Sequence, residues 1–371
     1  MRIMHILSDS NIGGAGILLE NLLRHTGLPK EDICVLLPRK AAMGERYRAL
    51  GVGTEEILSP DRSFYVRDLP VLLGAIRDFA PDVVHTHASL SGRVAAFLSG
   101  VPVRLATRHC AYPVGRAGRP FRRLLHRAAD SILTTCTVAT AHAAARNLRE
   151  LGISPNKIVM IRNGAEPLTP MPKKEREQRR AALGIREDCF CLGMAARLTP
   201  VKGQDLLLRA AARLLREEEK LHVLLVGAGE EQGKLERLAD SLGMTRHVTF
   251  TGFAPDTSVY VNLFDAAVNC SRGTETSCLA LSEAMSLGIP LVASDFGGNP
   301  EMVRNGENGL LFPKDDEGAL ARAMLRLMRD EALYRRLSDG ARARFEDDCN
   351  AARMAAEYDR LYKRLCASKK L

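Results

Sequence analysis

Short apolar runs alternate with amphipathic stretches along the whole chain. In the first half, the pattern predicts strands at residues 3–7, 33–37, 83–86, 103–107, 131–135 and 158–162. In the second half, it predicts strands at 191–195, 223–226, 248–251, 266–270, 291–294 and 310–312. Stretches between them, such as 15–24, 66–79 and 139–151, carry apolar residues at helical spacing. This repeated succession of strand and helix predicts an α/β protein with parallel sheets covered by helices on both faces.

A proline-rich, charged segment separates the two halves. Residues 167–180 combine three prolines with a run of charged side chains, which is typical of a linker that enters a helix. At roughly 100 to 200 residues per domain, 371 residues predict two domains, and we place them at 1–168 and 169–350. The amphipathic stretch 351–368 predicts a last helix that packs back on the first domain. We expect two Rossmann-like, doubly wound domains that face each other, with ligands at the carboxyl ends of the strands.

Composition narrows the class of protein. The chain is 46% hydrophobic and 26% charged, as in ordinary globular proteins. Its nine cysteines form no Cys-x-x-Cys pair and several lie in apolar runs, which indicates reduced, mostly buried thiols and neither a zinc site nor disulfides. The apolar run at the N-terminus is too short for a signal peptide, and no run approaches the 18 or so residues of a membrane span. We therefore expect a cytoplasmic protein that is at most peripheral on the inner face of the membrane.

The positive charge is concentrated in the first half. Residues 1–168 contain 22 Lys and Arg against 14 Asp and Glu, whereas residues 169–371 contain 31 against 30. Residues 83–129 hold eight arginines and no acidic residue. Such a segment attracts anionic lipid, a phosphorylated acceptor or nucleic acid, although a solvated basic helix is an equally good interpretation. Nucleic acid is disfavoured as a partner because the sequence shows no known reading module and few aromatic residues among the arginines.

The segment 271–294 carries the most informative chemistry. It follows a predicted strand and starts a predicted helix with Thr276 or Ser277 as N-cap. Glu275 and Glu283 are eight residues apart, so we expect one just before the helix and the other about two turns inside it, on a similar face. The N–H groups and dipole of a helix start suit a phosphate, and carboxylates suit sugar hydroxyls.

In this context the sequence resembles the family 4 retaining glycosyltransferases, whose hallmark is two Glu separated by seven residues. The same segment carries the family's Glu-Ala-Met-type helix and its Gly-x-Pro-x-Val-Ala-Ser strand. Further matches follow in the family's order, and they are S-N-I-G-G-A-G at 10–16, D-V-V-H-T-H at 82–87, T-R-H at 107–109, I-R-N-G at 161–164, A-R-L-T-P-V-K-G at 196–203, L-L-V-G-A-G at 224–229, V-T-F-T-G-F at 248–253 and G-G-N-P-E-M-V-R at 297–304. Most are weak singly, but together they cover nearly the whole chain.

The resemblance implies a fold and a reaction. The fold is GT-B, and the reaction moves a hexosyl unit, with retention, from a nucleoside-diphosphate sugar, preferably UDP-linked, to a saccharide or lipid-linked acceptor in cell-envelope or exopolysaccharide synthesis. It implies no cofactor and no metal, and the chain contains no Asp-x-Asp. Two alternatives stay open, a sugar-nucleotide epimerase of the same architecture and a catalytically silent sugar-nucleotide binder. A dinucleotide dehydrogenase is disfavoured because Leu19 and Gln232 stand where a third fingerprint glycine would be.

The resemblance also implies catalytic residues. Arg197 and Lys202 follow a strand and are expected to bind the donor diphosphate, where positive charge stabilises the leaving group by about 3–4 kcal/mol. His109 is expected to touch the donor sugar at its reacting edge, and Glu275 to hold that sugar. The family's Gly-Phe-Gly after the first Glu is replaced here by residues 276–278, Thr-Ser-Cys, which leaves the identity of the sugar open.

The remaining assignments by resemblance concern binding. The donor-binding residues are Gly14, Gly16, Gly252, Phe253, Ser277, Cys278, Leu279 and Glu283. Glu283 is assigned to the ribose, Gly252 and Phe253 to the base, and the glycines near the N-terminus to the diphosphate. The residues on the acceptor side are His87, Arg119, Arg122 and Arg123, the arginines serving an anionic membrane that presents a lipid-linked acceptor.

Overall fold

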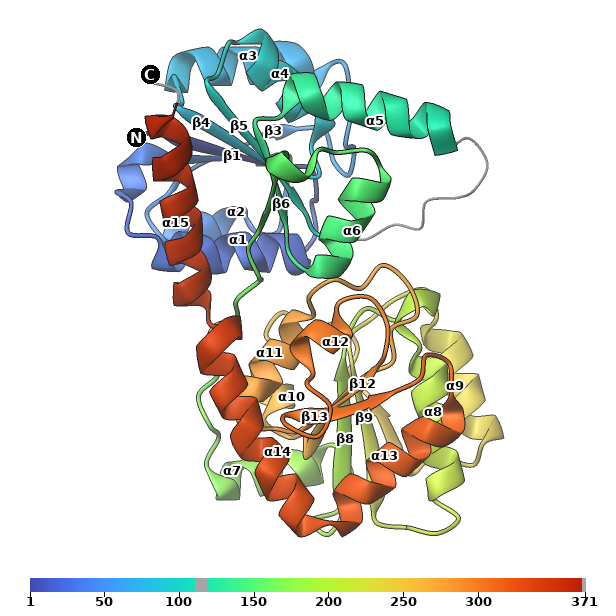
Figure 1. The fold of residues 1–371 in the computed structure, drawn as a ribbon. Coiled ribbons are helices and arrows are strands. Elements are labelled where there is room, and N and C mark those ends of the chain that lie inside the picture. Colours follow the sequence, from blue (N-terminus) through green and yellow to red (C-terminus); the bar gives the residue numbers. More distant parts are fainter. Residues whose placement is uncertain (111–118, 369–371) are drawn as a thin grey trace. The chain divides into compact units, whose positions relative to one another are not determined.

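The computed structural model describes residues 1–110 and 119–368 (Figure 1). The side chains of residues 119–123, 125 and 126 also lie outside the described part. The chain forms two compact units. Residues 1–164 and 351–371 form the first, here called domain 1, and residues 165–350 form the second, domain 2.

Domain 1 contains a seven-stranded parallel sheet in the order β3-β2-β1-β4-β5-β6-β7. Its strands are β1 (Ile3–Leu7), β2 (Ile33–Pro38), β3 (Gly53–Leu58), β4 (Val83–His87), β5 (Val103–Arg108), β6 (Cys136–Ala139) and β7 (Ile158–Met160). Its helices are α1 (Gly14–His25), α2 (Gly44–Ala49), α3 (Asp68–Phe79), α4 (Leu90–Leu98), α5 (Arg119–Leu133), α6 (His142–Glu150) and α15 (Ala351–Ala367).

Domain 2 contains a six-stranded parallel sheet in the order β10-β9-β8-β11-β12-β13. Its strands are β8 (Phe190–Ala195), β9 (Leu221–Val226), β10 (Val248–Phe250), β11 (Ala266–Asn269), β12 (Leu291–Ser294) and β13 (Gly309–Phe312). Its helices are α7 (Lys173–Ala182), α8 (Gln204–Leu214), α9 (Gln232–Ser241), α10 (Ser258–Val261), α11 (Leu279–Ser286), α12 (Asn299–Met302), α13 (Glu317–Arg329) and α14 (Glu331–Arg344).

Both faces of each sheet are buried, as the near-continuous apolar runs of the central strands require. In β1, Ile3 and Leu7 belong to one hydrophobic cluster, whereas Met4 and Ile6 belong to another on the opposite face. The cluster on the Ile3 face includes α1 and α15. Domain 2 is likewise built on two clusters, which use alternate residues of its strands.

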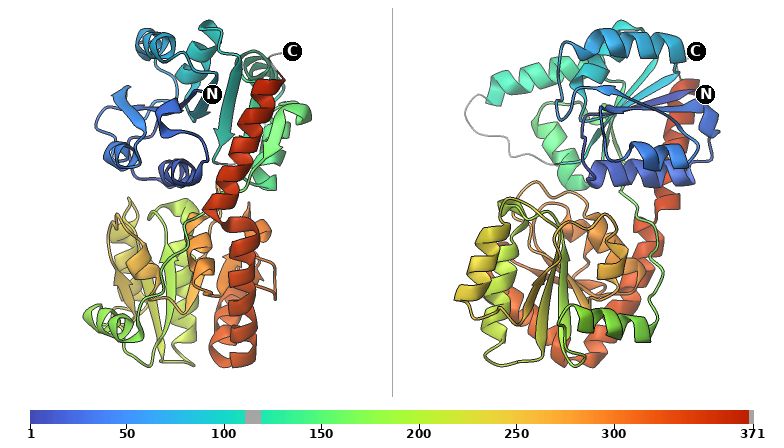
Figure 2. Two further views of the ribbon diagram at one scale, coloured as in Figure 1. Left: turned by 90° about the vertical axis from the view of Figure 1, so that its left-hand side faces the viewer. Right: turned by 180° about the vertical axis from the view of Figure 1, so that it is seen from behind.

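Helix α15 completes domain 1 although it is the last element of the chain. Five of its apolar residues, Met354, Ala355, Tyr358, Leu361 and Tyr362, are buried in the cluster that contains β1 and α1. Their spacing of one, three and four residues places them on a single helical face. In Figures 1 and 2, α15 lies beside α1 along the sheet of domain 1. The outgoing and returning segments of the chain are joined by a hydrogen bond from the Ala165 amide to the Cys349 carbonyl, at 2.8 Å.

The prediction of two Rossmann-like domains with parallel sheets is confirmed. The strand expected at 131–135 is wrong, because α5 continues to Leu133 and β6 begins only at Cys136. Strand β3 was missed because it combines one buried apolar residue with the polar residues Thr54, Glu55 and Glu56 at the edge of the sheet. The nine cysteines are free thiols, and six of them are buried. Among the described residues, no helix has the length and apolar character that crossing a bilayer requires.

Candidate active site

Loops that follow β8 and β11 bring Lys202 and Glu275 together at the carboxyl edge of the domain 2 sheet. The Lys202 Nζ donates to Glu275 Oε2 at 2.7 Å, and the Glu275 side chain is only 6% exposed. The two residues are 73 positions apart in the chain, so this contact is made by the fold. An ammonium group and a carboxylate are thus paired at the edge of the sheet where α/β proteins bind ligands.

A set of neutral polar groups supports Glu275. The same Oε2 accepts hydrogen bonds from Ser271 Oγ at 2.8 Å and Asn269 Nδ2 at 3.3 Å. Burial alone would raise the pKa of Glu275, but the Lys202 charge and these hydrogen bonds outweigh it and hold the pKa below its ordinary value. Glu275 is therefore ionised at neutral pH and can accept hydrogen bonds from hydroxyl groups.

A second layer of side chains orients the first. Asn299 Nδ2 donates to Ser294 Oγ at 3.1 Å, and Ser294 Oγ donates to the Ser271 carbonyl at 2.7 Å. Sequence reasoning did not single out Asn269, Ser271, Ser294 or Asn299. The signal was available, because polar residues end the apolar runs of β11 and β12.

The loop that carries Glu275 has a strained backbone. Thr274 adopts a φ of 56°, a conformation that is costly for a β-branched residue, by about 1–3 kcal/mol. The loop is also packed tightly against Gly297 and Gly298. A Cβ at Gly298 would lie 1.6 Å from the Thr276 carbonyl oxygen, and the Gly298 amide donates to the Glu275 carbonyl at 3.2 Å. The glycine pair therefore fixes the backbone that positions the Glu275 carboxylate.

The structure separates the two predicted diphosphate ligands by exposure. Lys202 is half-buried beside Glu275, whereas Arg197 is exposed two residues beyond the end of β8. Gly227 and Gly229 pack against the loop that carries Arg197. A Cβ on either glycine would lie 2.2 Å from a carbonyl oxygen, that of Ala196 or of Leu198. These glycines thus allow two backbone segments to pack closely, and this packing explains why glycine is needed at both positions without a role in binding a dinucleotide.

Helix α11 begins later than the sequence predicts. Its N-cap is Cys278, neither Thr276 nor Ser277, and the helix runs from Leu279 to Ser286. Thr276 is buried under Gly298 and cannot serve as the cap. Glu283 is therefore only the fifth helical residue, and Glu275 belongs to the preceding loop and not to the same helical face. The predicted sugar ligands Ser277, Cys278 and Leu279 form the approach to the first turn, where backbone N–H groups lack intrahelical acceptors.

Glu283 lies on α11 in a different environment from Glu275. Its Oε2 accepts a hydrogen bond from Thr257 Oγ1 at 3.1 Å. Burial raises the pKa of Glu283 to about 7, against the lowering effect of the Thr257 hydrogen bond and with a smaller raising effect of Asp256. The pKa values of the two glutamates are therefore shifted in opposite directions: Glu275 is stabilised in its ionised form and Glu283 in its neutral form.

Replacing Glu283 with glutamine is expected to stabilise the ligand-free protein at pH 8 by about 1–2 kcal/mol, after allowance for partial exposure. A carboxyl group with a raised pKa costs stability as pH rises from its ordinary value of 4.5 to about 7. Urea unfolding of both proteins at pH 4 and pH 8 measures this, and the gain should be present at pH 8 and absent at pH 4. An equal gain at both pH values would contradict the assignment.

The predicted base-binding residues lie just beyond β10. Gly252 has a φ of 72°, and the Phe253 side chain is 61% exposed. The Gly252 carbonyl accepts a hydrogen bond from the Gly227 amide at 3.0 Å, which ties this turn to the end of β9. Phe253 is therefore not a core residue, and its exposed ring is available to a flat ligand.

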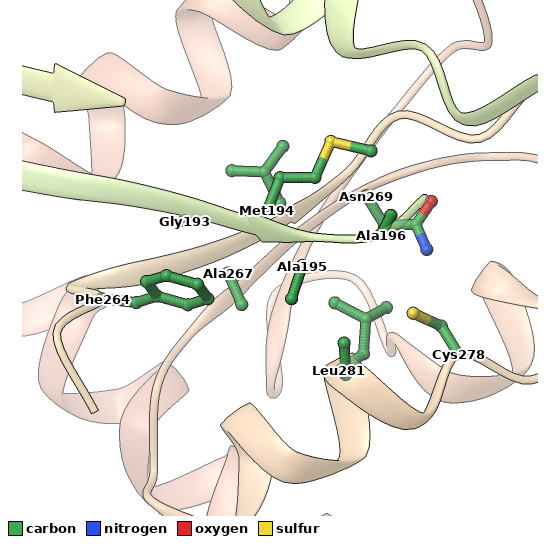
Figure 3. A pocket seen from close by; sticks show the side chains of 11 residues that line it. Gly193, Met194, Ala195, Ala196, Phe264, Ala267, Asn269, Cys278 and Leu281 are labelled. Carbon is green, nitrogen blue, oxygen red and sulfur yellow. The ribbon is translucent and has the colours of Figure 1, made fainter. Parts of the chain in front are cut away.

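A small cavity lies between the sheet and α11 (Figure 3). Its lining is mostly apolar, from Gly193–Ala196 of the β8 region, from Phe264 and from Leu281. Asn269 and Cys278 lie toward one end of it, so the cavity borders the Glu275 cluster. Its walls offer few polar groups to a sugar or a phosphate.

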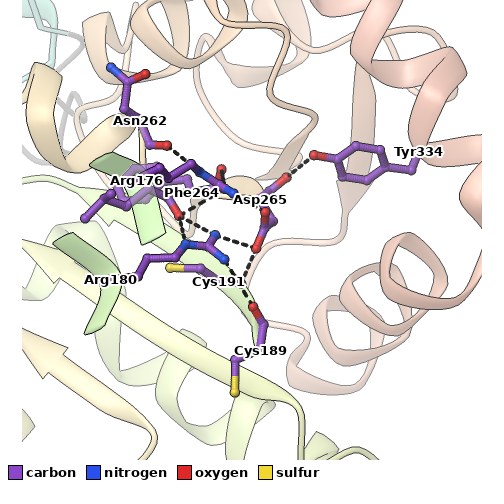
Figure 4. A network of polar contacts seen from close by, with 9 residues as sticks. Arg176, Arg180, Cys189, Cys191, Asn262, Phe264, Asp265 and Tyr334 are labelled. Carbon is purple, nitrogen blue, oxygen red and sulfur yellow. Dashed lines mark hydrogen bonds and ion pairs between the residues drawn. The ribbon is translucent and has the colours of Figure 1, made fainter. Parts of the chain in front are cut away.

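A second polar cluster lies at the opposite, amino edge of the same sheet (Figure 4). Asp265 accepts hydrogen bonds from Arg176 at 2.8 Å, Arg180 at 2.6 Å and the Cys191 amide at 2.7 Å. The Arg180 side chain is 6% exposed and also donates to the Leu263 and Cys189 carbonyls. This cluster fastens α7 to the sheet, away from the edge that carries Lys202 and Glu275.

The glycine-rich segment of domain 1 joins β1 to α1. Gly14 is the first residue of α1 and is exposed, and a Cβ there would meet nothing within 4 Å. Gly16 is buried, and a Cβ would lie 2.9 Å from Met43 Cγ. Its carbonyl accepts a hydrogen bond from the Tyr47 hydroxyl at 2.9 Å. The structure thus leaves room for a ligand at Gly14 and gives Gly16 a packing role.

His109 lies just past the end of β5, and its Nε2 is 3.0 Å from His87 Nδ1. His87 was expected on the acceptor side, but only 2% of it is exposed and its Nε2 lies 3.3 Å from His5 Nδ1. Both of its ring nitrogens are thus engaged inside domain 1, so His87 offers no polar atom to an acceptor. The side chains of Arg119, Arg122 and Arg123 lie outside the described residues.

Comparisons with known proteins identify both halves of the chain. Residues 175–344 match the model of glycosyl transferases group 1, and residues 12–167 match that of glycosyltransferase family 4. The chain is 31% identical over 314 residues to the D-inositol 3-phosphate glycosyltransferase of Streptomyces bingchenggensis, covering 76% of this chain and 68% of that protein. It is 30% identical over 294 residues to EpsD of Bacillus subtilis, a protein provisionally named as a glycosyltransferase, covering 75% and 76%.

Solved structures agree with the sequence comparison. The crystal structure of HepE from Anabaena in complex with UDP superposes with a TM-score of 0.84, at 20% identity, over 98% of this chain and all of HepE. Crystal structures of HepE with UDP and glucose and with UDP-glucose superpose equally well. The chain therefore belongs to the family 4 glycosyltransferases, and it is a glycosyltransferase with the GT-B fold.

Proposed function

We propose that this protein transfers a hexosyl unit from UDP-hexose to a saccharide or lipid-linked acceptor in cell-envelope or exopolysaccharide synthesis, with retention and without a metal ion. The observation that carries the proposal is the pairing of Lys202 with the buried, ionised Glu275 at the carboxyl edge of domain 2. HepE, which shares the fold, binds UDP and UDP-glucose, and this supports a uridine nucleotide as the donor.

The charges of the site fit the departure of a diphosphate. Lys202 and Arg197 would neutralise the negative charge that grows on the diphosphate as its bond to C1 of the hexose breaks. Two cationic side chains can supply this stabilisation in the role that a divalent ion plays in other enzymes. Glu275 would accept hydrogen bonds from hydroxyls of the hexose, and Glu283 from those of the ribose.

The proposed reaction needs no covalent intermediate with a protein nucleophile, because one bond to C1 breaks as another forms. The bond from C1 to the diphosphate oxygen breaks, and a bond from C1 to the acceptor oxygen forms on the same face of the sugar. The proton of the acceptor hydroxyl passes to the leaving diphosphate. In this scheme His109 contacts the donor sugar next to C1 and the backbone at residues 277–279 holds its far edge.

Nucleotide binding tests both the choice of a uridine nucleotide as donor and the independence from a metal ion. With UDP at a hundredfold excess over its Kd, we expect about 2.7 kcal/mol of stabilisation in thermal unfolding, unchanged by EDTA. Equal stabilisation by GDP or ADP would reject the choice of UDP, and its loss with EDTA would reject metal independence. A panel of UDP-sugars with product analysis then separates transfer from epimerisation, because an epimerase forms no glycoside.

The acceptor side of the proposal includes an anionic membrane. Phe97 and Leu98 at the end of α4 and Leu124 and Ile132 on α5 are 42%, 60%, 64% and 52% exposed, and α4 contacts α5. Exposed apolar residues next to a basic segment are typical of surfaces that bind anionic lipid. Sedimentation with anionic vesicles at low salt tests this step, and a protein that stays in the supernatant would reject it.

A further inference from the structure

Four imidazoles converge in domain 1, and the strand register explains why. His5 of β1 is the register partner of His85 of β4, and His87 is the partner of Thr107 of β5. His5, His85, His87 and Thr107 all lie on the face of the sheet on which Ile3 and Leu7 are buried, because alternate residues of a strand face the same way. His109 follows two residues after Thr107. The cluster thus runs from the core of the domain to the carboxyl edge of its sheet.

Three of the rings form a chain of hydrogen bonds. His5 Nδ1 lies 3.3 Å from His87 Nε2, and His87 Nδ1 lies 3.0 Å from His109 Nε2. Each pair of rings is close to parallel, with interplanar angles of 28° and 23°. His87 therefore uses both of its ring nitrogens, one toward each neighbour.

These rings are neutral at physiological pH. Burial lowers the pKa of His5 to about 3 and of His109 to about 4, and that of His87 lies well below its ordinary value. The titratable groups that act on His87 are the imidazoles of His85, His109 and His5. A neutral imidazole has one N–H donor and one nitrogen acceptor. The protons of the chain therefore all point toward His109 or all point away from it, and in either arrangement the tautomer of His87 sets the tautomer of His109.

We propose that His87, with His5 behind it, is a positioning residue that fixes the tautomer and the ring orientation of His109 through this hydrogen-bonded chain. The proposal rests on the proposed function, in which His109 contacts the donor sugar. A fixed tautomer presents the sugar with one defined polar atom, a donor or an acceptor. Loss of the fixed tautomer mixes the two forms and weakens whichever contact the reaction needs.

His85 provides a matched control inside the same cluster. Its ring centroid is 4.3 Å from that of His87, and it is fully buried. Its nitrogens, however, bind Tyr362 OH at 2.7 Å and Thr107 Oγ1 at 2.6 Å. His85 therefore shares the environment of the chain without belonging to it.

A metal ion is the competing occupant of this cluster. Ligand atoms of His5, His85 and His87 lie within 4.8 Å of one another. To bind an ion, His85 would have to give up Tyr362 or Thr107, and the ion's double charge would be buried among neutral rings and hydroxyls. The hydrogen bonds that the structure shows favour the chain.

The test is the tautomeric state of His109 in the full-length protein labelled with ¹⁵N-histidine. The His109→Gln variant identifies its resonances. We expect one tautomer in the unmodified protein and in His85→Phe, and a mixture in His87→Phe. A mixture in the unmodified protein, or a single tautomer in folded His87→Phe, would overturn the proposal. Stoichiometric binding of Zn²⁺ that is lost in His5→Phe would overturn it as well.

Kinetics provide the second readout. In His87→Phe we expect kcat to fall by about ten- to hundredfold, with the Kd for UDP unchanged because the rings that surround His87, those of His5, His85 and His109, are not among the residues assigned to the nucleotide. In His85→Phe both quantities should stay close to those of the unmodified protein. The NMR measurement is made without a sugar nucleotide. A failure of UDP to bind would therefore reject the proposed function, but it would not decide whether His109 has a single tautomer. If His87→Phe does not fold, the spectrum of the unmodified protein still tests the proposal.

Discussion

Replacing Lys202 with alanine is expected to lower kcat for sugar transfer by about 10²–10³-fold. The Lys202 ammonium is the charge that is paired with Glu275, and in the proposed reaction it stabilises the departing diphosphate. Removal of one preorganised charge or donor of this kind costs about 3–4 kcal/mol of transition-state stabilisation. Steady-state kinetics with UDP-hexose measure the loss, and Lys202→Arg should restore part of it because the positive charge is retained.

The same change has an effect on stability with a predictable dependence on pH. Glu275 now has a lowered pKa, so its pairing contributes stability above the ordinary pKa of a carboxyl group and loses it as pH falls. Without Lys202, burial dominates, and the pKa of Glu275 should rise. Lys202→Ala should therefore be most destabilising near neutral pH and approach the unmodified protein at pH 4.

An exposed lysine of the same domain serves as the control. Lys234 pairs with Glu231 on the surface of domain 2, with 67% of its side chain exposed. Lys234→Ala should change neither kcat nor stability appreciably. If the kcat of Lys202→Ala were within threefold of that of the unmodified protein, the assignment of Lys202 to the diphosphate site would be wrong.

Replacing Asp265 with alanine is expected to destabilise domain 2 by about 3–5 kcal/mol. The change leaves the buried Arg180 and its neighbour Arg176 without the carboxylate that both bind, and an uncompensated buried charge is costly. The Cys191 amide also loses its acceptor. A shift of the urea midpoint to lower concentration measures the loss.

The location of Asp265 separates this effect from catalysis. Asp265 precedes β11, whereas Glu275 follows its carboxyl end. Asp265→Ala should therefore keep its kcat at temperatures where it is folded. Asp188, which forms an exposed pair with Arg186, is the matched control, and Asp188→Ala should leave the midpoint nearly unchanged. An unchanged midpoint in Asp265→Ala would show that the carbonyls around Arg180 suffice.

The sequence predicted the sheets well because their strands are short apolar runs with clear boundaries. Strand 291–294 was predicted with the bounds that the structure has, and 3–7 likewise. The hydrophobic pattern gave wrong predictions where a strand is not a continuous apolar run, or where an apolar run is not a strand. β3 carries two glutamates at the edge of its sheet, and the apolar residues at 132 and 133 belong to the end of α5.

The candidate site was predicted only as a set of residues, without their contacts. The motifs named Lys202, Glu275, Glu283 and His109. The 2.7 Å pairing of Lys202 with Glu275 could not be predicted, because it depends on the adjacency of β8 and β11 in a sheet order that reverses at β8. Likewise, the pairing of His5 with His87 depends on the register of β1 and β4, which periodicity alone does not give. The opposite pKa shifts of the two glutamates follow from those contacts.

The path of the chain sets the order in which the protein is completed during synthesis. Domain 1 emerges first from the ribosome, yet Tyr358 and Tyr362, which fill its core and hold His85 and Thr107, are translated after the whole of domain 2. Domain 2 is continuous from Ala165 to Asn350 and contains all the strands of its sheet. One face of the domain 1 sheet, which α1 covers only in part, must therefore wait for about half of the chain to be made, and His85 and Thr107 gain their tyrosine partners only when the last helix is released.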